Sequence, residues 1–178
     1  MIKKTLNARL KKIKLLVSDV DGVLTDGGAY YSDNGLHLKK FNIRDGMGMV
    51  LLRKAGYKVA IVTSEKTKLV ELRAQRLQID DIHQGVINKV EAVESLMQKY
   101  SLAWDEVAFI GDDINDIPVL KKVGFASVPS DGTSANKRTA HYVTQAAGGN
   151  GCVREVCDLL LGLHYKGEAI TELWLKKL

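Results

Sequence analysis

The stretch IKLLVSDVDGVLTDG (residues 13–27) runs from a short apolar segment directly into Asp19, Asp21 and Asp26. Its first eight residues are rich in apolar side chains, three of them β-branched, which is typical of a strand buried on both faces of a parallel sheet. Acidic side chains at the end of such a strand cost stability unless they bind something. The stretch therefore predicts a buried strand with a polar site at its carboxyl end.

Apolar runs and amphipathic segments alternate along the rest of the chain. Further strands are predicted at 57–64, 106–113 and 124–129, with weaker ones near 81–85 and 141–144. Apolar residues at helical spacing predict helices over 45–56, 67–78 and 88–100. Such alternation favours right-handed crossovers and a sheet covered by helices on both faces. We therefore expect an α/β fold with a doubly wound parallel sheet.

Two segments lie outside this alternation. Residues 27–41 are interpreted as two short strands around the turn SDNG, which predicts a β-hairpin flap over the end of the first strand. The tail at 162–178 carries an apolar stripe formed by Ile170, Leu173, Trp174, Leu175 and Leu178. We expect this stripe to pack on its own domain, with docking on a neighbouring subunit as the alternative. No linker interrupts the chain, so residues 1–178 are expected to form a single domain.

The composition is that of an ordinary globular protein and excludes several classes. The 178 residues are 46% hydrophobic and 26% charged, and no apolar stretch approaches the ~18 residues that cross a bilayer. The basic N-terminus lacks the apolar core of a secretory signal, so we expect a cytoplasmic protein. The net charge of +5 comes from scattered Lys and Arg without interleaved aromatics, which disfavours a nucleic-acid partner. Cys152 and Cys157 form no CxxC pair, and we expect two reduced thiols.

Polar residues gather at the predicted strand ends, where open α/β sheets bind ligands. The residues concerned are Asp19, Asp21, Thr63, Ser64, Asp112, Asp113 and Asp116, together with Lys89 at a helix start. Crowded carboxylates repel one another, and a hard divalent cation such as Mg²⁺ relieves that repulsion. Each motif alone is more often a solvated loop, but their joint occurrence favours a catalytic site.

Asp19 and Asp21 flank Val20, and Gly22 lets the chain turn directly after them. The two carboxylates are therefore free to take different roles, one as a nucleophile and the other as a proton donor to a leaving oxygen. Thr63 and Lys89 are expected to hold a transferring phosphoryl group. The sequence thus indicates phosphoryl-transfer chemistry.

The motifs DVDGVLTDG, IVTS, Lys89 and GDDINDIP, in this order, resemble the four motifs of the haloacid dehalogenase superfamily, which is rich in Mg²⁺-dependent phosphatases. The stretches KKFNIRDGMG, HQGVINK and GGNGCVRE are similar to its capless branch, which contains the 3-deoxy-D-manno-octulosonate 8-phosphate phosphatases. The likeness covers residues 13–161. It implies a Rossmann-type sheet with no cap domain, and a homotetramer in which flap and neighbouring subunit close the site.

The resemblance also implies a role for each matched residue. Asp19 would form an aspartyl-phosphate, and Asp21 would act as general acid and then as general base. Thr63 and Lys89 would bind the phosphoryl group. Mg²⁺ would be held by Asp19, Asp112 and the backbone carbonyl of Asp21, supported by Asp113 or Asp116. Substrate contacts are implied for Asp21, Asn42, Ile43, Arg44, Asp45, Gly46, Glu65, Arg73 and Lys89.

Residue 65 separates two possible substrates. Octulosonate phosphatases usually carry Gly-Arg after the motif Thr, whereas this chain has Ser64-Glu65, which is more similar to phosphatases of nonulosonate 9-phosphates. FNIRDG and GGNGCVRE resemble the octulosonate branch. We therefore expect 3-deoxy-D-manno-octulosonate 8-phosphate, a sugar of lipopolysaccharide biosynthesis, with a KDN or N-acetylneuraminate 9-phosphate as the alternative.

Arg44, Arg73 and Arg76 are candidates for pairing with a sugar carboxylate, because guanidinium groups match carboxylates bidentately.

A regulator of the same fold that hydrolyses nothing has no need of both Asp19 and Asp21, so an enzyme is favoured over a binding module.

Overall fold

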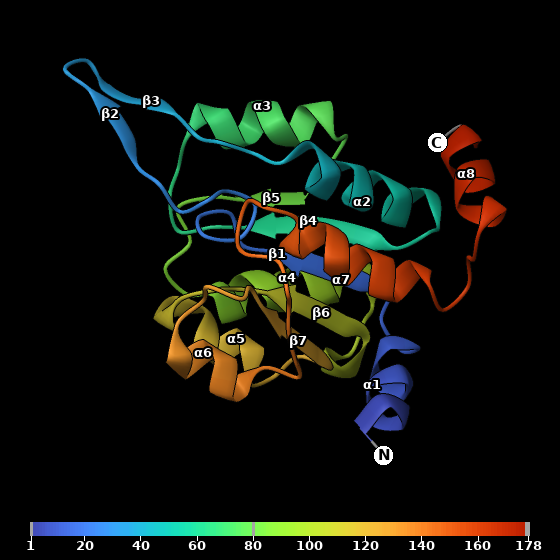
Figure 1. Cartoon of the computed structure of the whole chain (residues 1–178). Helices are drawn as coiled ribbons and strands as arrows, with labels where there is room; N and C mark the ends of the chain where they lie inside the picture. Colours follow the sequence, from blue (N-terminus) through green and yellow to red (C-terminus); the bar gives the residue numbers. More distant parts are fainter. Residues whose placement is uncertain (1, 80, 177–178) are drawn as a thin grey trace.

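The computed structural model describes residues 2–79 and 81–176, and a six-stranded parallel sheet forms its centre (Figure 1). The strands lie in the order β5-β4-β1-β6-β7-β8. Their bounds are β1 Leu15–Ser18, β4 Lys58–Val62, β5 Asp81–His83, β6 Val107–Ile110, β7 Phe125–Val128 and β8 Tyr142–Val143. Each strand falls within or overlaps a predicted range, so the expected doubly wound α/β fold is confirmed.

Helices cover both faces of the sheet because successive strand residues point to opposite sides. Leu16 of β1 belongs to an apolar cluster shared with α2 (Ile43–Lys54), α3 (Lys68–Arg76) and α7 (Cys152–Leu161). Leu15 and Val17 belong to a second cluster, shared with α4 (Lys89–Tyr100) and α5 (Ile117–Leu120). The predicted helices over 45–56, 67–78 and 88–100 correspond to α2, α3 and α4. The core is therefore split into two layers by a buried sheet.

Several short helices were not predicted. They are α1 (Ile2–Leu10), α5, α6 (Ser134–Thr139) and the 3₁₀ turns Trp104–Glu106 and Ile114–Asp116. Helices of this length are marginal on their own in water, and packing against the rest of the protein stabilises them. Their sequences therefore carry little helical signal.

The predicted hairpin is present. Strands β2 (Tyr30–Ser32) and β3 (Gly35–Leu38) pair antiparallel, and a bridge between Thr25 and Phe41 closes the base. Figure 1 shows the hairpin projecting from the body near the carboxyl end of the sheet. Its side chains Tyr31 and Leu38 are exposed. The hairpin thus presents apolar groups to the outside rather than to the core.

The tail folds as α8 (Glu168–Leu175) and packs on its own chain. Leu173 is fully buried, and Lys54 Nζ of α2 donates to the Trp174 carbonyl at 2.7 Å. The same ammonium lies 5.1 Å from the centre of the Trp174 ring. Leu175 stays exposed, and Leu178 lies outside the described residues. No helix of the described chain is both long enough and apolar enough to span a membrane.

The strand order determines where a ligand fits. From β1 the chain first builds β4 and β5 on one side, and then returns to place β6 on the other side of β1. The loops after β1 and β6 therefore leave the sheet in different directions, which opens a crevice at their carboxyl ends. Asp19 and Asp112 follow these two strands.

Candidate active site

A cavity of about 350 Å³ lies at the carboxyl ends of β1, β4 and β6. Its lining includes Asp19 and Asp21 from the first loop, Thr63 and Glu65 from the second, and Asp112 from the third. The residues predicted from separate motifs are therefore brought together. Ser64 and Asp113 line the same cavity, and Asn115 donates to the Ser64 hydroxyl at 3.2 Å.

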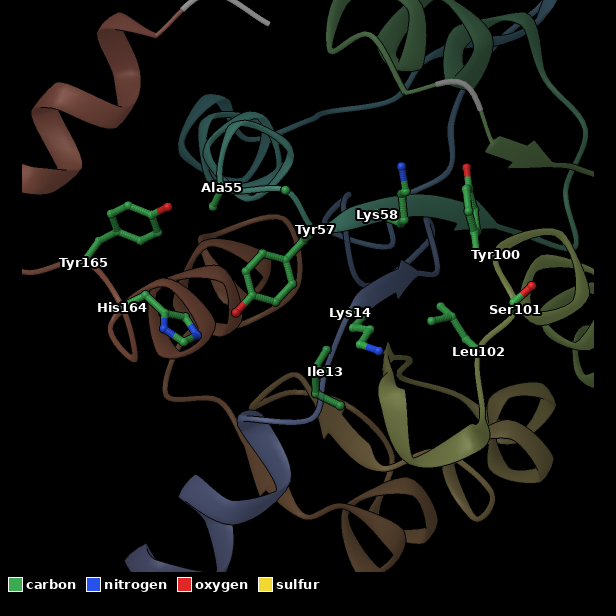
Figure 2. A pocket seen from close by; sticks show the side chains of 11 residues that line it. Ile13, Lys14, Ala55, Tyr57, Lys58, Tyr100, Ser101, Leu102, His164 and Tyr165 are labelled. Carbon is green, nitrogen blue, oxygen red and sulfur yellow. The ribbon is translucent and has the colours of Figure 1, made fainter.

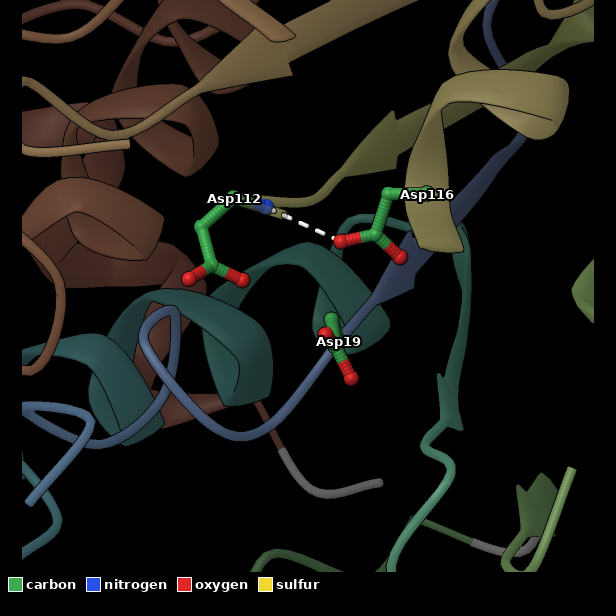
Figure 3. Close-up of side chains that lie close together, drawn as sticks. All are labelled: Asp19, Asp112 and Asp116. Carbon is green, nitrogen blue, oxygen red and sulfur yellow. Dashed lines mark hydrogen bonds between the residues drawn. The ribbon is translucent and has the colours of Figure 1, made fainter. Parts of the chain in front are cut away.

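Three carboxylates converge near the carboxyl ends of β1 and β6, and two of them, Asp19 and Asp112, line this cavity (Figure 3). Asp19, Asp112 and Asp116 each offer an oxygen that lies within 4.8 Å of the others. One oxygen of Asp116 accepts from the Asp112 amide at 3.0 Å, which is the dashed contact in Figure 3. The 3₁₀ turn Ile114–Asp116 produces this arrangement because it directs Asp116 back toward the end of β6.

Lys89 balances part of this charge. It begins α4, where the Asn88 side chain caps the helix, and its side chain is fully buried. Its Nζ lies 2.8 Å from Asp19 Oδ2 and 2.6 Å from Asp116 Oδ1. Burial alone would lower the pKa of Lys89, but the two carboxylates outweigh it and raise the pKa. Lys89 is therefore a fixed positive charge beside Asp19.

The negative charge of Asp19 and Asp112 is not fully balanced by the cations around them. Burial and the neighbouring Asp116 raise the pKa of Asp19 to about 7, and Lys89 opposes this shift without cancelling it. Burial, Asp116 and Asp113 raise the pKa of Asp112 to about 7 as well. Among the described residues, no cation lies within ion-pair distance of Asp112. Oxygen ligands with excess negative charge fit a hard divalent cation such as Mg²⁺.

Glycines allow the loops to approach one another closely. Gly22 has φ +76°, and a Cβ there would lie 2.0 Å from Asp112 Oδ2. A Cβ on Gly148 would lie 1.9 Å from the Gly22 carbonyl oxygen. The Gly-rich segment before α7 therefore packs closely on the loop after β1, and the Gly149 amide donates to the Val23 carbonyl at 2.9 Å.

None of the described residues that line the cavity comes from the start of α2 or from α3. The Asn42 side chain accepts from the Arg44 amide at 2.8 Å and so caps α2. Arg73 of α3 donates to the Asn42 carbonyl at 2.9 Å, and Gly46 provides the space it needs, since a Cβ there would lie 2.3 Å from Arg73 Nη2. Ile43 and Arg44 are exposed, as is Arg76 of α3.

Asp45 is not brought into the cavity, although the resemblance implied a substrate contact for it. Its carboxylate is fully buried and accepts from the backbone amides of Arg154 at 2.7 Å and Gly151 at 3.2 Å. Those amides form the N-terminus of α7, where a negative charge is favoured. Asp45 therefore connects α2 to α7.

Lys39 is a site residue that the sequence reasoning missed. It follows β3 of the hairpin, and its ammonium forms ion pairs with Asp21 Oδ1 and Glu65 Oε2. Burial alone would lower its pKa, and the two carboxylates raise it overall. The neighbouring Lys40 is exposed and lies 3.4 Å from Asp26. Nothing in the pair KK at 39–40 distinguishes these two lysines before the hairpin is folded.

A larger cavity of about 570 Å³ lies at the opposite, amino end of the sheet (Figure 2). Lys14, Lys58, Tyr57, Tyr100 and Tyr165 contribute to its wall. None of the described residues that line it is acidic. It therefore has none of the carboxylates that the predicted chemistry needs, and the smaller cavity is the candidate active site.

Comparison with characterised families and relatives gives a consistent result. A family model described as haloacid dehalogenase-like hydrolase matches residues 65–156. The chain is 47% identical over 154 residues to 3-deoxy-D-manno-octulosonate 8-phosphate phosphatase KdsC of Escherichia coli strain K12, covering 86% of this chain and 82% of that protein. The corresponding phosphatase of Yersinia pestis is 42% identical over 165 residues, covering 93% and 88%.

Solved structures are also similar to this chain. A putative hydrolase of haloacid dehalogenase subfamily III A from Legionella pneumophila superposes with a TM-score of 0.95 at 38% identity, covering 99% of this chain and 97% of that one. The 3-deoxy-D-manno-octulosonate 8-phosphate phosphatase of Moraxella catarrhalis, in complex with magnesium ion, phosphate ion and KDO, superposes with a TM-score of 0.87 at 35% identity. That match covers 91% of this chain and 92% of that one.

Proposed function

The chain belongs to the haloacid dehalogenase-like hydrolase family, and on this basis we propose that it hydrolyses 3-deoxy-D-manno-octulosonate 8-phosphate to the free sugar acid and phosphate. The chemistry is supported by one observation above all, the convergence of Asp19, Asp112 and Asp116, two of which, Asp19 and Asp116, pair with Lys89. The choice of sugar is supported by the 47% identical relative.

The proposed reaction proceeds in two steps. Asp19 attacks phosphorus, which forms an aspartyl-phosphate and breaks the bond to the sugar oxygen, and Asp21 donates a proton to that oxygen. Asp21 then takes a proton from the water that attacks the aspartyl-phosphate, so that phosphate leaves and Asp19 is restored. Lys89 and Thr63 hold the phosphoryl oxygens during both steps.

Mg²⁺ is the cofactor of this proposal. Asp19, Asp112 and the backbone carbonyl of Asp21 would hold it, with Asp116 or Asp113 in support. When bound, it supplies positive charge to the carboxylates and the phosphoryl oxygens. The raised pKa values of Asp19 and Asp112 support this assignment, because they indicate carboxylates that lack a sufficient countercharge.

The sugar is proposed to lie between the cavity and the start of α2. Asn42, Ile43, Arg44, Gly46 and Arg73 are the proposed contacts on that side. Asp45 is proposed to support them indirectly, because its carboxylate fixes α2 to the N-terminus of α7. We place the reaction in the cytoplasm, where free thiols such as Cys152 and Cys157 remain reduced.

We further propose that the chain forms a homotetramer. Several apolar side chains in the hairpin and in segments that follow strands are exposed, and such side chains often mark protein interfaces. They include Tyr31, Leu38, Ile43, Ile87 and Ile114. Size-exclusion chromatography with light scattering tests this assembly, and a monomer at working concentrations would contradict it.

A nonulosonate 9-phosphate is the second candidate substrate. The observation in its favour is Glu65, which lies on the cavity wall. The test is kcat/KM for octulosonate 8-phosphate and nonulosonate 9-phosphates, measured side by side with Mg²⁺ and again with EDTA. We expect the 8-phosphate to be favoured at least about tenfold, which corresponds to roughly 1.4 kcal/mol of transition-state binding. Comparable values for both sugars, or turnover of neither, would contradict the proposed substrate.

A further inference from the structure

The hairpin contributes one side chain to the active site. The Lys39 side chain is only 5% exposed, and its ammonium contacts Asp21 Oδ1 and Glu65 Oε2. The three residues come from three separate segments, namely the end of β3, the loop after β1 and the loop after β4. Lys39 is therefore the point at which the flap, the proposed proton donor and the cavity wall meet.

The carboxylates around the Lys39 ammonium explain why a cation is needed at this place. Asp21 and Glu65 face the same cavity as Asp19 and Asp112, and their side chains are 38% and 44% exposed. The proposed substrate carries a phosphate and a carboxylate. Without Lys39, two carboxylates at the rim would oppose the entry of that anion.

We propose that Lys39 and Glu65 together set the substrate preference of the site, with Lys39 holding Glu65 in an ion pair so that its charge does not repel the sugar carboxylate. The inference rests on the proposed function and deepens it. With its charge balanced by Lys39, Glu65 is compatible with the octulosonate substrate and does not by itself indicate a nonulosonate. Lys39 acts as a positioning residue, since it works through Glu65 and Asp21.

The same ammonium orients the proposed proton donor. Lys39 and the Thr25 hydroxyl both contact Oδ1 of Asp21, the hydroxyl at 3.4 Å. Oδ2 is therefore the oxygen that remains for the leaving group. Without Lys39, Asp21 Oδ1 keeps only the contact with the Thr25 hydroxyl and loses the one with the ammonium. We therefore expect kcat to depend on Lys39, independently of the effect that Lys39 has on Glu65.

The experiment is a double-variant cycle with octulosonate 8-phosphate. K39M is expected to raise KM roughly tenfold, because the carboxylate of Glu65 then lacks its partner and repels the anionic substrate. In K39M/E65Q, KM is expected to return to within about threefold of the wild-type value, since the uncompensated charge at residue 65 is gone. K39M is also expected to lower kcat, and this loss should persist in K39M/E65Q, because Asp21 lacks its partner in both variants.

Two single variants complete the cycle. E65Q is expected to lower KM about threefold, because it frees positive charge on Lys39 for the substrate. K39R is expected to retain most of the wild-type activity, because arginine keeps the positive charge at residue 39. K40M is the matched control from the same hairpin, and its kcat and KM are expected to stay within about twofold of wild type, as for other exposed ion pairs.

The outcomes separate the two claims. A wild type that does not turn over octulosonate 8-phosphate overturns the proposed function, and the inference with it. A wild type that is active, with no recovery of KM in K39M/E65Q, overturns the inference alone. So does a tenfold rise of KM in E65Q, because Glu65 would then contact the substrate directly. If K39M loses cooperative thermal unfolding, E65Q and K39R still decide the question.

Discussion

The two ends of the same strands carry cavities that are built in different ways. At the carboxyl end, Asp19 and Asp112 are held with pKa values of about 7, because the protein buries them without enough positive charge. At the amino end, Lys14 is paired with Glu106, and Lys58 lies 5.2 Å from the centre of the Tyr100 ring. The two lysines at the larger cavity thus each have a partner group nearby, whereas no cation of the described residues lies within ion-pair distance of Asp112 at the smaller one. Under-compensated charge, rather than cavity size, is what marks the carboxyl end as the candidate active site.

Replacing Asp19, the proposed nucleophile at the carboxyl end, is expected to have the largest effect on activity. D19N is expected to lower kcat by roughly four orders of magnitude or more, because no aspartyl-phosphate can form. Phosphate release at saturating Mg²⁺ measures the loss. D105N, which changes an exposed aspartate paired with Lys12, is the control and should retain activity. Mg²⁺-dependent hydrolysis by D19N at a tenth of the wild-type rate would exclude Asp19 as the nucleophile.

A pair of glycines compares the two ends directly. Gly22 and Gly56 both have positive φ, at +76° and +93°, but a Cβ at Gly56 meets no described atom within 4 Å. G56A should therefore cost only the backbone strain of about 1 kcal/mol. G22A adds a clash with Asp112 Oδ2, and we expect its kcat/KM to fall roughly a hundredfold, as expected for a displaced catalytic group. Equal loss of activity in both variants would mean that close approach at Gly22 is unimportant.

The contrast between the two ends also shows what a sequence can predict. Strand periodicity and the rule that ligands bind at carboxyl ends were enough to predict the sheet and to bring Asp19, Thr63, Lys89 and Asp112 together. Those signals are local, since each motif directly follows or precedes one element.

The residues that were missed or misplaced depend on contacts between distant segments. Lys39 reaches Asp21 only because the hairpin folds over the end of β1, and a lysine pair does not reveal which ammonium turns inward. Asp45 lies next to implied substrate contacts in the sequence, yet its partners are amides of residues 151 and 154. No pattern within either segment encodes these pairings.

The pKa values predict how Mg²⁺ stabilises the protein. Asp19 and Asp112 have pKa values of about 7 in the folded state against 3.8 ordinarily, so between about pH 4 and pH 7 the folded state holds protons that the unfolded state has released. The free energy of unfolding of the metal-free protein should therefore fall as pH rises through that window. Mg²⁺ must displace those protons at pH 5.5 but not at pH 8, so it should raise the melting temperature more at pH 8.

Differential scanning fluorimetry with and without Mg²⁺ at the two pH values measures this effect. D112N is the control, because removal of one proposed ligand should abolish most of the Mg²⁺-induced shift at both values. Equal shifts for the wild-type protein at pH 5.5 and pH 8 would show that neither carboxyl loses a proton when the metal binds.

The smallest effect is expected at the amino end. K58M removes a cation from the wall of the larger cavity and from the Tyr100 ring, a contact worth about 0.5–1 kcal/mol at an exposed site. Its melting temperature should fall by a few degrees at most, and its kcat/KM should stay within about twofold of wild type, because satisfied charges at this end take no part in the reaction. K39M makes the same chemical change at the carboxyl end and is the natural comparison. A tenfold loss of kcat/KM in K58M would mean that the larger cavity participates after all, and under-compensated charge would no longer separate the two ends.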